Sequence, residues 1–499
     1  MTHFALRRAS AGILIALILA ASPAPARGNE LFEEEWHLFF LDGKPAGYQR
    51  ISIRSREDGG ATVTAFQKVI VKRGPSTARV SVTTTTEEDA TGRILGFRTV
   101  QSLSDVPMEA VGRREGEDLV VTESAEGKDT RTSRVAVPPE AVGPARADRI
   151  LKERLKQPGD SAEVTTFLAE ARRFTREKHL LDGEESVDIR GTVKTLRRVT
   201  SSVDILPGLV TRSWFDAELN LEKSSMPFAG LEAVTYRSSL EEVLRQDFSS
   251  PPEIFFSSAV AVNRRVPSGA REALYRITRR EGARGANGSG AGKLALHEGP
   301  GQKIVKADER STLLRVRRVE PREEVKRPVA ATPELEEYLR PNAYIQSGDE
   351  AIRRIAEEVA GEESRAWKAA CLLEKWVESN VVEKNLNTSF ATAREVLASR
   401  SGDCTEHAVL HAALLRAAGI PARVVAGLVH VDGVFVGHMW TEVHAGDWIP
   451  LDPTRAHCGV GADHIALSVS SLDSSLLDPV LEIVAILGNI KIEVVELTE

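Results

Sequence analysis

The sequence predicts a multidomain α+β protein with an N-terminal antiparallel β-rich region, a β-sandwich-like middle segment and a C-terminal α+β domain. The first observation is length, because 499 residues exceed what one ordinary hydrophobic core holds, so three or four domains are expected. The second is an alternation of apolar and polar residues that dominates the chain from Glu35 to about Leu244. The third is a helical spacing of apolar residues beyond residue 334, followed by two β-like runs.

The first residues have the pattern of an export signal. Arg7 and Arg8 precede an apolar run over residues 11–21, and Ala24-Pro25-Ala26 matches a cleavage site. We therefore expect residues 1–26 to be a signal peptide and the mature protein to be exported, either periplasmic or secreted. The apolar run is short for a membrane span, so no stable span is expected after cleavage. A retained N-terminal anchor remains the alternative.

Composition excludes some classes of partner. Apolar residues make up 42% and charged residues 27% of the chain, which is typical of globular protein. A net charge of −7 spread over this length predicts no nucleic-acid partner. Aromatic residues are sparse at 5%, which counts against a surface that stacks on sugars or single-stranded bases.

Residues 30–248 predict a β-rich domain. Strands over 35–41 and 48–53, with a turn between them, form a hairpin, and further strands are expected at 79–86, 208–216 and 231–236. Residues 147–155 and 161–171 are interpreted as short helices. A strongly curved antiparallel sheet with few helices fits this pattern, and we expect it to bind or position a partner.

Residues 252–328 predict a small Ig-like β domain. Strands around 273–279 and 312–319 flank a Gly-, Ala- and Ser-rich stretch at 282–292, which is interpreted as a long hairpin loop. A charged, Pro-punctuated boundary follows at 323–333. After it, residues 334–475 predict an α+β domain with helices over 349–359 and 364–381. Residues 476–499 predict a final β-hairpin with arms at 480–487 and 490–495.

Cys404 opens the most informative segment of the chain. Gly402 and Asp403 break the segment before it, and an apolar helix follows until Gly419 and Pro421. Cys404 should therefore lie in the first helical turn, where unpaired N–H groups and the helix dipole lower the pKa of a thiol. Its own backbone N–H would then be a natural donor to an oxyanion.

His438 and Asp452 lie on the two β-like runs after this helix. If the turn over residues 445–447 centres on Gly446, residues whose numbers sum to 892 face each other. His438 and Asp452 are then diagonal neighbours on one face of the sheet, close enough for Asp452 to accept an imidazole N–H. This arrangement leaves the other ring nitrogen for Cys404. A register shift of one residue would place the two side chains on opposite faces.

These segments resemble the transglutaminase-like superfamily, the papain-like group of Cys-His-Asp enzymes. The matching pieces, in family order, are residues 402–406, 415–423, 437–442 and 448–454. The resemblance covers only about residues 390–455. It implies a transglutaminase-like catalytic domain over residues 334–475, with Cys404 as nucleophile, His438 as general base and acid, and Asp452 as the orienting carboxylate.

The chemistry implied by the resemblance is acyl transfer from an amide through a thioester, by a peptidase or amidase or by a protein-glutamine transferase. Hydrolysis is favoured because water is the default acceptor and no amine-binding site is recognisable. A protein or peptide substrate is expected. The expected cofactor set is none, since no Asp-rich loop has calcium-ligand spacing.

Two alternatives from other classes remain. Some members of this superfamily have lost the triad, so the domain could be a non-catalytic binding or scaffold module. Cys404, His407 and His411 at i, i+3 and i+7 could instead form a zinc face, although the Ala and Leu residues around them indicate a packed helix.

The residues around the site have structural interpretations. Trp440 is expected to wall the site and Arg423 to form a structural pair, while Glu406 is expected to be a first-turn helix charge rather than a catalytic group. If Cys404 is a reactive thiol, Cys371 and Cys458 remain as a candidate disulfide. Spacing alone cannot place their Cα atoms.

Overall fold

A computed structural model describes residues 32–73, 76–125, 128–205, 209–228, 230–254, 259–280, 296–322, 324–383, 390–473, 486–487 and 489–499. The predicted signal peptide and the predicted loop at 282–292 lie outside these residues. Within them, no helix combines the length and the apolar character needed to cross a bilayer.

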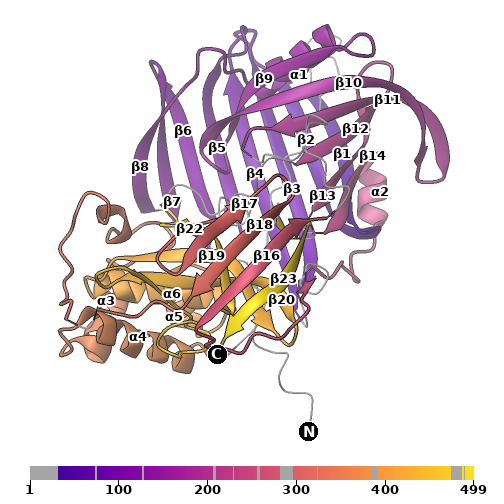
Figure 1. The fold of residues 1–499 in the computed structure, drawn as a ribbon. Coiled ribbons are helices and arrows are strands. Elements are labelled where there is room, and N and C mark those ends of the chain that lie inside the picture. Colours follow the sequence, from indigo (N-terminus) through magenta and orange to yellow (C-terminus); the bar gives the residue numbers. More distant parts are fainter. Residues whose placement is uncertain are drawn as a thin grey trace.

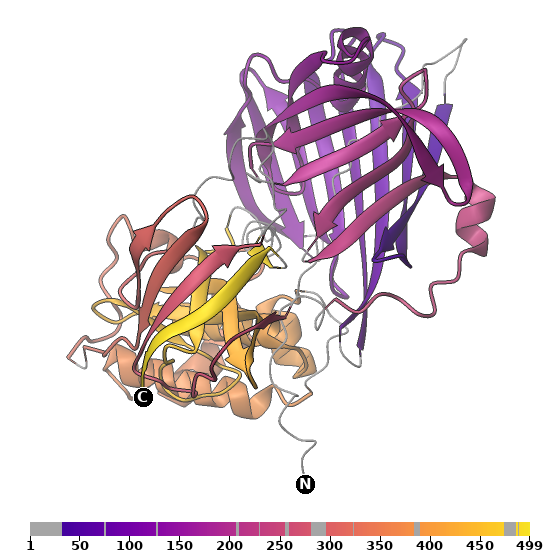
Figure 2. The same ribbon diagram turned by 45° about the vertical axis from the view of Figure 1, so that its right-hand side comes forward.

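The N-terminal region is one antiparallel sheet, which in the described part of the chain has fourteen strands. It runs from β8 at one edge through β1, then from β14 to β9 at the other edge. Figures 1 and 2 show that it curls round so that β10–β12 lie in front of the earlier strands. Its strands are β1 (Phe32–Leu41), β2 (Lys44–Ser55), β3 (Ala61–Arg73), β4 (Ser76–Glu88), β5 (Ile94–Ser102), β6 (Met108–Glu115), β7 (Asp118–Ala125), β8 (Lys128–Ala136), β9 (Ser161–Leu168), β10 (Arg173–Ile189), β11 (Thr192–Val203), β12 (Val210–Phe215), β13 (Leu221–Phe228) and β14 (Leu231–Ser238).

The first hairpin confirms the predicted strand pair. Leu41 pairs with Lys44 across Asp42 and Gly43, whose φ angles of 48° and 75° suit a two-residue turn. The strands predicted at 79–86, 208–216 and 231–236 are found as β4, β12 and β14.

One of the two helices predicted in this region is wrong. The predicted helix at 147–155 is found as α1 (Pro144–Arg154), with its proline in the first turn. The predicted helix at 161–171 is instead strand β9, which pairs with β10 along its whole length. Four consecutive β-branched or aromatic residues, Val164 to Phe167, favour the strand once a neighbour is available. The short helix α2 (Leu240–Arg245) follows β14.

The middle segment does not form a separate Ig-like sandwich in the described residues. Its strands β16 (Glu272–Arg279), β17 (Gln302–Ala307) and β18 (Ser311–Arg317) share one sheet with β23 (Ile490–Thr498), in the order β17-β18-β16-β23. The remaining strand, β15 (Val260–Ala261), pairs with β20 of the next sheet. One four-stranded sheet has an apolar face that needs a second layer. The C-terminal sheet supplies it, and Tyr275 of β16 meets Phe435 edge to face at 5.6 Å.

The predicted pairing of the C-terminal hairpin is wrong for its second arm. The arm at 490–495 is a strand, β23, but its partner among the described residues is β16. Residues 480–485 of the other arm lie outside the described residues. Strand β23 therefore joins the end of the chain to a segment about two hundred residues earlier, a pairing that no local pattern indicates (Figure 2).

In the C-terminal region, helices pack against an antiparallel sheet (Figure 1). Its sheet has the order β15-β20-β19-β22, with β21 also paired to β20. The helices predicted at 349–359 and 364–381 are found. The elements are η1 (Glu336–Tyr338), α3 (Glu350–Ala360), α4 (Ala366–Asn380), α5 (Ala393–Ser399), α6 (Cys404–Ala417), β19 (Ala422–Val431), β20 (Val434–His444), β21 (Trp448–Leu451) and β22 (His464–Ser470).

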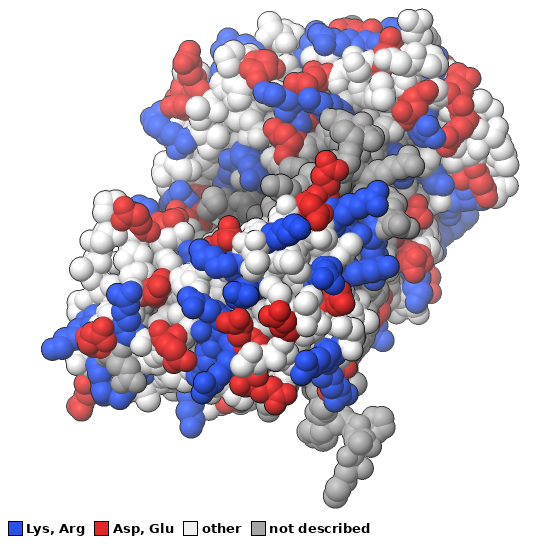
Figure 3. All heavy atoms as spheres, in the orientation of Figure 1, with Lys and Arg blue, Asp and Glu red and all other residues white. Residues whose placement is uncertain are grey.

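Helix α6 is the centre of this region. Every residue from Cys404 to Arg416 is buried. The helix is covered on all sides, because α3, α4 and α5 pack against α6 together with β19 and β20. This central position fixes where the first turn of α6, and therefore Cys404, lies relative to β20. Away from the core, the face in Figure 3 carries interspersed positive and negative side chains.

Candidate active site

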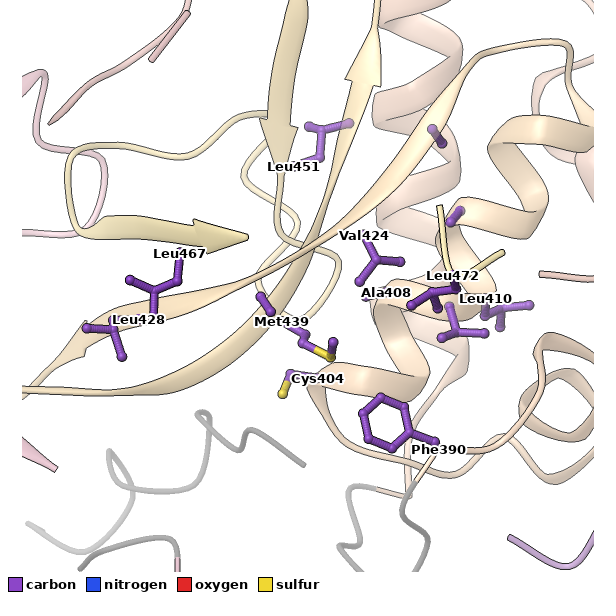
Figure 4. Close-up of a cluster of buried hydrophobic side chains, with 14 of the residues drawn as sticks. Phe390, Cys404, Ala408, Leu410, Val424, Leu428, Met439, Leu451, Leu467 and Leu472 are labelled. Atoms are coloured by element: carbon purple, nitrogen blue, oxygen red, sulfur yellow. The ribbon is translucent and has the colours of Figure 1, made fainter. Parts of the chain in front are cut away.

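Cys404 is the first residue of α6, as predicted. The N-cap is Asp403, whose Oδ1 accepts the N–H of Thr405 at 2.8 Å. Gly402 has a φ of 150°, and a Cβ there would lie 2.2 Å from the Cβ of Glu406, so only glycine fits this close approach. The Cys404 side chain is 2% exposed. Figure 4 shows it at the start of α6, beside Met439 of β20.

Glu406 holds the N-terminus of this helix in place. Its Oε2 accepts the N–H of Asp403 at 2.9 Å, which completes a capping box. Its Oε1 accepts the N–H groups of Phe390 and Ala391 at 3.0 and 3.1 Å. One buried carboxylate therefore binds three backbone donors that would otherwise lack partners. The structural interpretation of Glu406 is confirmed.

His438 and Asp452 meet in the predicted register. Strand β21 pairs with β20 through Thr441 and Leu451 and through His444 and Trp448, and each pair sums to 892. Nε2 of His438 lies 3.0 Å from Oδ2 of Asp452, and both side chains are buried. The other carboxylate oxygen accepts from the N–H and hydroxyl of Thr454 at 3.0 and 2.7 Å.

Strand β20 has a buried stretch of edge at His438 that pairs with no strand among the described residues. On the side away from β19, β15 pairs with Val434 and Phe435, and β21 pairs with residues 441–444. Between them, the described residues place no strand against β20. Figure 4 shows Cys404, at the start of α6, near Met439, the residue of β20 that follows His438.

The electrostatics of the pair follow from burial and from neighbouring charges. Burial lowers the pKa of His438, and the attraction of Asp452 does not fully offset it. Burial alone would raise the pKa of Asp452, but the charges and hydrogen bonds of His438 and His464 outweigh burial and hold that pKa well below its usual range. Asp452 is therefore a carboxylate, and His438 is a neutral base at rest.

Nδ1 of His438 is the ring nitrogen that Asp452 leaves open. It is buried and has no hydrogen-bond partner among the described residues. An imidazole that donates from Nε2 to a carboxylate presents a lone pair on Nδ1. This is the atom that could accept a thiol proton. That Cys404 supplies the proton remains a prediction.

His464, Asp463 and Arg455 belong to the same cluster and were not predicted from the sequence. Nε2 of His464 lies 3.3 Å from Oδ2 of Asp452, and its Nδ1 lies 3.2 Å from Oδ1 of Asp463. The Arg455 guanidinium lies 3.5 Å from Asp452 and 2.9 Å from Asp463. The available signal was an adjacent Asp-His pair before an apolar run. Its meaning depends on the pairing of β22 with β19, which brings Ala466 opposite Gly427.

Trp440 and Arg423 behave as predicted. The Trp440 ring stacks on His438 at a centroid distance of 6.1 Å and meets His464 edge to face at 5.2 Å. It therefore walls the histidine pair. Arg423 donates from Nε to Glu442 at 2.8 Å and lies over the Trp448 ring at 4.1 Å.

The alternative zinc face of Cys404, His407 and His411 on α6 is not assembled among the described residues. Nδ1 of His407 lies 2.6 Å from the carbonyl oxygen of Asp403, and Nδ1 of His411 lies 2.8 Å from Oγ1 of Thr441. Burial lowers the pKa of His411 to about 3, so this ring is a neutral member of the core. Among the described residues, the three side chains whose candidate ligand atoms do gather, within 4.8 Å, are His438, Asp452 and His464. Hydrogen bonds and the nearby Arg455 cation account for that cluster without a metal.

Glu374 and a disulfide fasten the loop that follows Asp452 to α4. Cys371 and Cys458 are bonded, with their Cα atoms 5.1 Å apart. The Glu374 carboxyl accepts the N–H of Cys458 at 2.8 Å and is 1% exposed. Burial raises the pKa of Glu374 to about 8. The candidate disulfide is thus found in the structure, and it anchors the segment that carries Asp452.

The comparisons with known proteins identify a family for part of the C-terminal region. Residues 353–453 match the family model of the transglutaminase-like superfamily, and they include Cys404, His438 and Asp452. The C-terminal region therefore carries a transglutaminase-like domain. No curated protein sequence matches the chain.

Three solved structures resemble parts of the chain. One is a candidate cysteine protease from Cytophaga hutchinsonii, with 17% identity, a TM-score of 0.32, and coverage of 46% of this chain and 89% of that one. A second is the periplasmic domain of TgpA from Pseudomonas aeruginosa, with 18% identity, a TM-score of 0.25, and coverage of 40% and 89%. A third is a beta-barrel-like protein of a domain of unknown function from Brucella abortus, with 16% identity, a TM-score of 0.32, and coverage of 41% and 95%.

Proposed function

We propose that this protein is a cysteine-dependent amide hydrolase, a peptidase or amidase, in which Cys404, His438 and Asp452 act together. The observation that carries the proposal is the buried 3.0 Å contact between His438 and Asp452, in the same domain as a cysteine at the first position of a helix. Burying a charge is costly, since a buried charge that loses its partner destabilises a protein by about 3–5 kcal/mol. A scaffold has no physical need to accept that risk by burying a histidine–carboxylate pair.

The reaction would proceed through a thioester. His438 takes the Cys404 proton at Nδ1 while the sulfur attacks the amide carbonyl carbon and the carbonyl oxygen becomes an oxyanion. The backbone N–H of Cys404, in the first turn of α6, would donate to that oxyanion. When the intermediate collapses, the C–N bond breaks and His438 delivers its proton to the leaving amine.

Water then completes the cycle in the proposed hydrolysis. His438 accepts a proton from the water that attacks the thioester carbonyl, and the proton returns to the sulfur as the acid leaves. An amine in place of water would give transfer rather than hydrolysis. Hydrolysis is favoured because water needs no binding site of its own. Asp452 remains a carboxylate throughout and stabilises the imidazolium that forms.

Export is part of the proposal, and the disulfide supports it. A structural bond between Cys371 and Cys458 persists in an oxidising compartment and is rare in a reducing one. The signal-like pattern at residues 1–26 points to the same route.

We propose the domain boundaries expected from the sequence, near residues 30–248, 252–328 and 334–475, with β23 joined to the sheet of the middle segment. A protein or peptide is the proposed substrate class.

Alkylation of the folded protein tests the nucleophile. Labelling of Cys404 by iodoacetamide would be followed by mass spectrometry from pH 4 to pH 9 in the unchanged protein and in the His438→Ala variant. His444→Ala is the matched control, because His444 lies at the end of the same strand and contacts Trp448 rather than Asp452. Slower labelling near neutral pH in His438→Ala alone supports the proposal.

Product analysis tests the reaction class. An unfolded protein substrate would be incubated with the enzyme and with a labelled primary amine. New amino termini that depend on Cys404 indicate hydrolysis, while incorporation of the amine indicates transfer. If labelling of Cys404 occurs only above pH 8 and is the same in all variants, the thiol is an ordinary one and the domain is a scaffold.

A further inference from the structure

His464 is a buried histidine that contacts Asp452 but has no role in the proposed triad. It opens strand β22 and is 4% exposed. Its two ring nitrogens face two different carboxylates, Asp452 at 3.3 Å and Asp463 at 3.2 Å. A neutral imidazole carries one N–H and can donate to only one of them. Nε2 has hydrogen-bond geometry to Asp452, whereas the 3.2 Å approach of Nδ1 to Asp463 is an ion-pair contact without it. Two carboxylates this close to one buried ring favour its doubly protonated form, because both attract the positive charge.

The charges of this cluster agree with that assignment. Burial alone would lower the pKa of His464, but Asp463 and Asp452 outweigh burial and raise it. Asp463 is likewise held as a carboxylate, because His464 and Arg455 offset its burial and lower its pKa to about 2. Two anions and two cations then balance while His438 is neutral. Buried charges are tolerated when they are paired in this way.

Asp452 is the group that both histidines share. The same oxygen, Oδ2, contacts His438 at 3.0 Å and His464 at 3.3 Å, and Arg455 approaches it to 3.5 Å. An orienting carboxylate normally makes its histidine more basic, because the negative charge favours the imidazolium. Here that charge is already partly neutralised, and the His464 ring lies 6.0 Å from the His438 ring.

We infer that His464 is a positioning residue of the proposed site: as an imidazolium held between Asp452 and Asp463, it shares the Asp452 carboxylate with His438 and limits how strongly that carboxylate stabilises protonated His438. The inference rests on the proposed function and adds a regulation to it. His438 is kept neutral at rest, and the thiol proton is transferred only when substrate is attacked. Asp452 is also fixed in place by His464, independently of its contact with His438.

Other titratable groups surround the cluster from every packed element. They are His411 of α6, Glu374 of α4, Tyr275 of β16, His430 of β19, and Arg455 and Asp463 of the connecting loop. Burial raises the pKa of Tyr275 and lowers the pKa of His430, so neither gains charge near neutral pH. Glu374 has a pKa raised by burial to about 8. A measurement between pH 4.5 and pH 7 therefore avoids its ionisation.

Titration of His438 itself tests the inference. The full chain would be labelled with ¹⁵N-histidine in a Cys404→Ala background, which removes the thiol, and the ring nitrogen signals would be followed from pH 4.5 to pH 7. The His438 signals are those that vanish in the His438→Gln variant. We expect His464→Gln to move the midpoint of His438 upward by about one pH unit, a ten-fold change in its protonation constant.

The matched control is His179→Gln. His179 is also buried on a strand and also lies near a carboxylate, Glu177 at 3.6 Å, but it belongs to the N-terminal sheet. This variant should leave the His438 midpoint unchanged. A midpoint that stays constant or falls in His464→Gln would overturn the inference, because His464 would then not compete for Asp452.

A second variant keeps the test available if His464→Gln does not fold. Asp463→Asn removes the anion that holds the charge on His464, and its amide oxygen can still accept from Arg455. It should move the His438 midpoint in the same direction by a smaller amount, and an unchanged midpoint would overturn the inference. Failure of the proposed function looks different. In that case alkylation of Cys404 would not depend on His438, whatever the titration in the Cys404→Ala background shows.

Discussion

Nε2 of His438 and Oδ2 of Asp452 lie 3.0 Å apart, although fourteen residues separate them along the chain. The contact depends on one turn. The register set at Gly446, which has a φ of 87°, puts Thr441 opposite Leu451. Continued by one residue, this register puts position 440 opposite position 452, so His438, two residues from 440 on the same face, lies diagonally across from Asp452. A hairpin of this kind makes an orienting pair rigid, because a slip of one residue would put the two side chains on opposite faces of the sheet.

Replacing Asp452 by asparagine should remove most of the amide hydrolysis. An amide of the same shape can donate to Nε2 of His438, which reverses the tautomer and puts the proton on Nδ1. We expect turnover to fall by about 10³- to 10⁴-fold, as such replacements do in other triads. The measurement is release of new amino termini from an unfolded protein substrate.

Asp432→Asn is the control for that variant. Asp432 lies in the exposed turn between β19 and β20 with a φ of 49°, a conformation that asparagine also adopts. Its turnover should match that of the unchanged protein. Equal turnover in Asp452→Asn and Asp432→Asn would show that Asp452 does not orient the base.

The elements with strong local signals could be predicted from the sequence. The first hairpin, the first turn of α6 and the register at Gly446 each depend on residues within a few positions of one another, although the turn predicted over residues 42–47 is only Asp42 and Gly43. For the same reason, the contact between His438 and Asp452 could be predicted from the sequence. Both residues belong to one hairpin, and a two-residue period decides which face they share.

The elements and contacts that were predicted wrongly or missed depend on segments far away in the sequence. Residues 161–168 became β9 because β10 offers a pairing edge, which overrides a weak local preference. Strand β23 joins β16, and β22 joins β19 so that His464 reaches Asp452. No periodicity within these segments names their partners. His464 and Arg455 were missed for this reason, and Glu374 was missed because its role depends on how α4 docks.

Glu406→Gln should destabilise the C-terminal domain. The glutamine amide group would face backbone N–H groups of Asp403, Phe390 or Ala391 that now donate to a carboxylate. A buried donor without an acceptor costs about 1–3 kcal/mol, and a lost charge-assisted bond adds to that. We expect the free energy of unfolding to fall by about 3 kcal/mol, measured by urea denaturation.

Glu242→Gln is the matched control for Glu406→Gln. Glu242 closes a capping box with Ser239 on the exposed helix α2, through its contact with the Ser239 N–H at 2.8 Å. Water can replace that contact, so the loss should stay near about 0.5–1 kcal/mol. Equal losses in the two variants would contradict the special role of the buried carboxylate.

The thiol count should separate Cys404 from the other two cysteines. With Cys371 and Cys458 bonded, the unfolded but unreduced protein should react with a thiol reagent at one cysteine, and the reduced protein at three. The bond closes a loop with a sequence separation of 87, so removing it in the double variant C371S/C458S should cost about 4 kcal/mol. Dithiothreitol should lower the urea midpoint of the unchanged protein but not of the double variant. Three reactive thiols before reduction would contradict the bond.

Ionisation of Glu374 should make stability fall as pH rises from about 5 to 8. Burial raises the pKa of Glu374 from 4.5 to about 8, so over this range the unfolded chain releases a proton that the folded protein keeps. The folded state then binds more protons than the unfolded state, and the free energy of unfolding decreases with pH by up to about 1.4 kcal/mol per unit. Glu374→Gln keeps an oxygen for the N–H of Cys458 and cannot ionise. It should match the unchanged protein at pH 5 and exceed its stability at pH 8 by on the order of 3 kcal/mol, measured by urea denaturation.

Glu378→Gln, one turn further along α4, is the control and should leave the pH dependence of the unfolding free energy unchanged. A Glu374→Gln variant that loses stability with pH as steeply as the unchanged protein would show that Glu374 is already ionised in the fold.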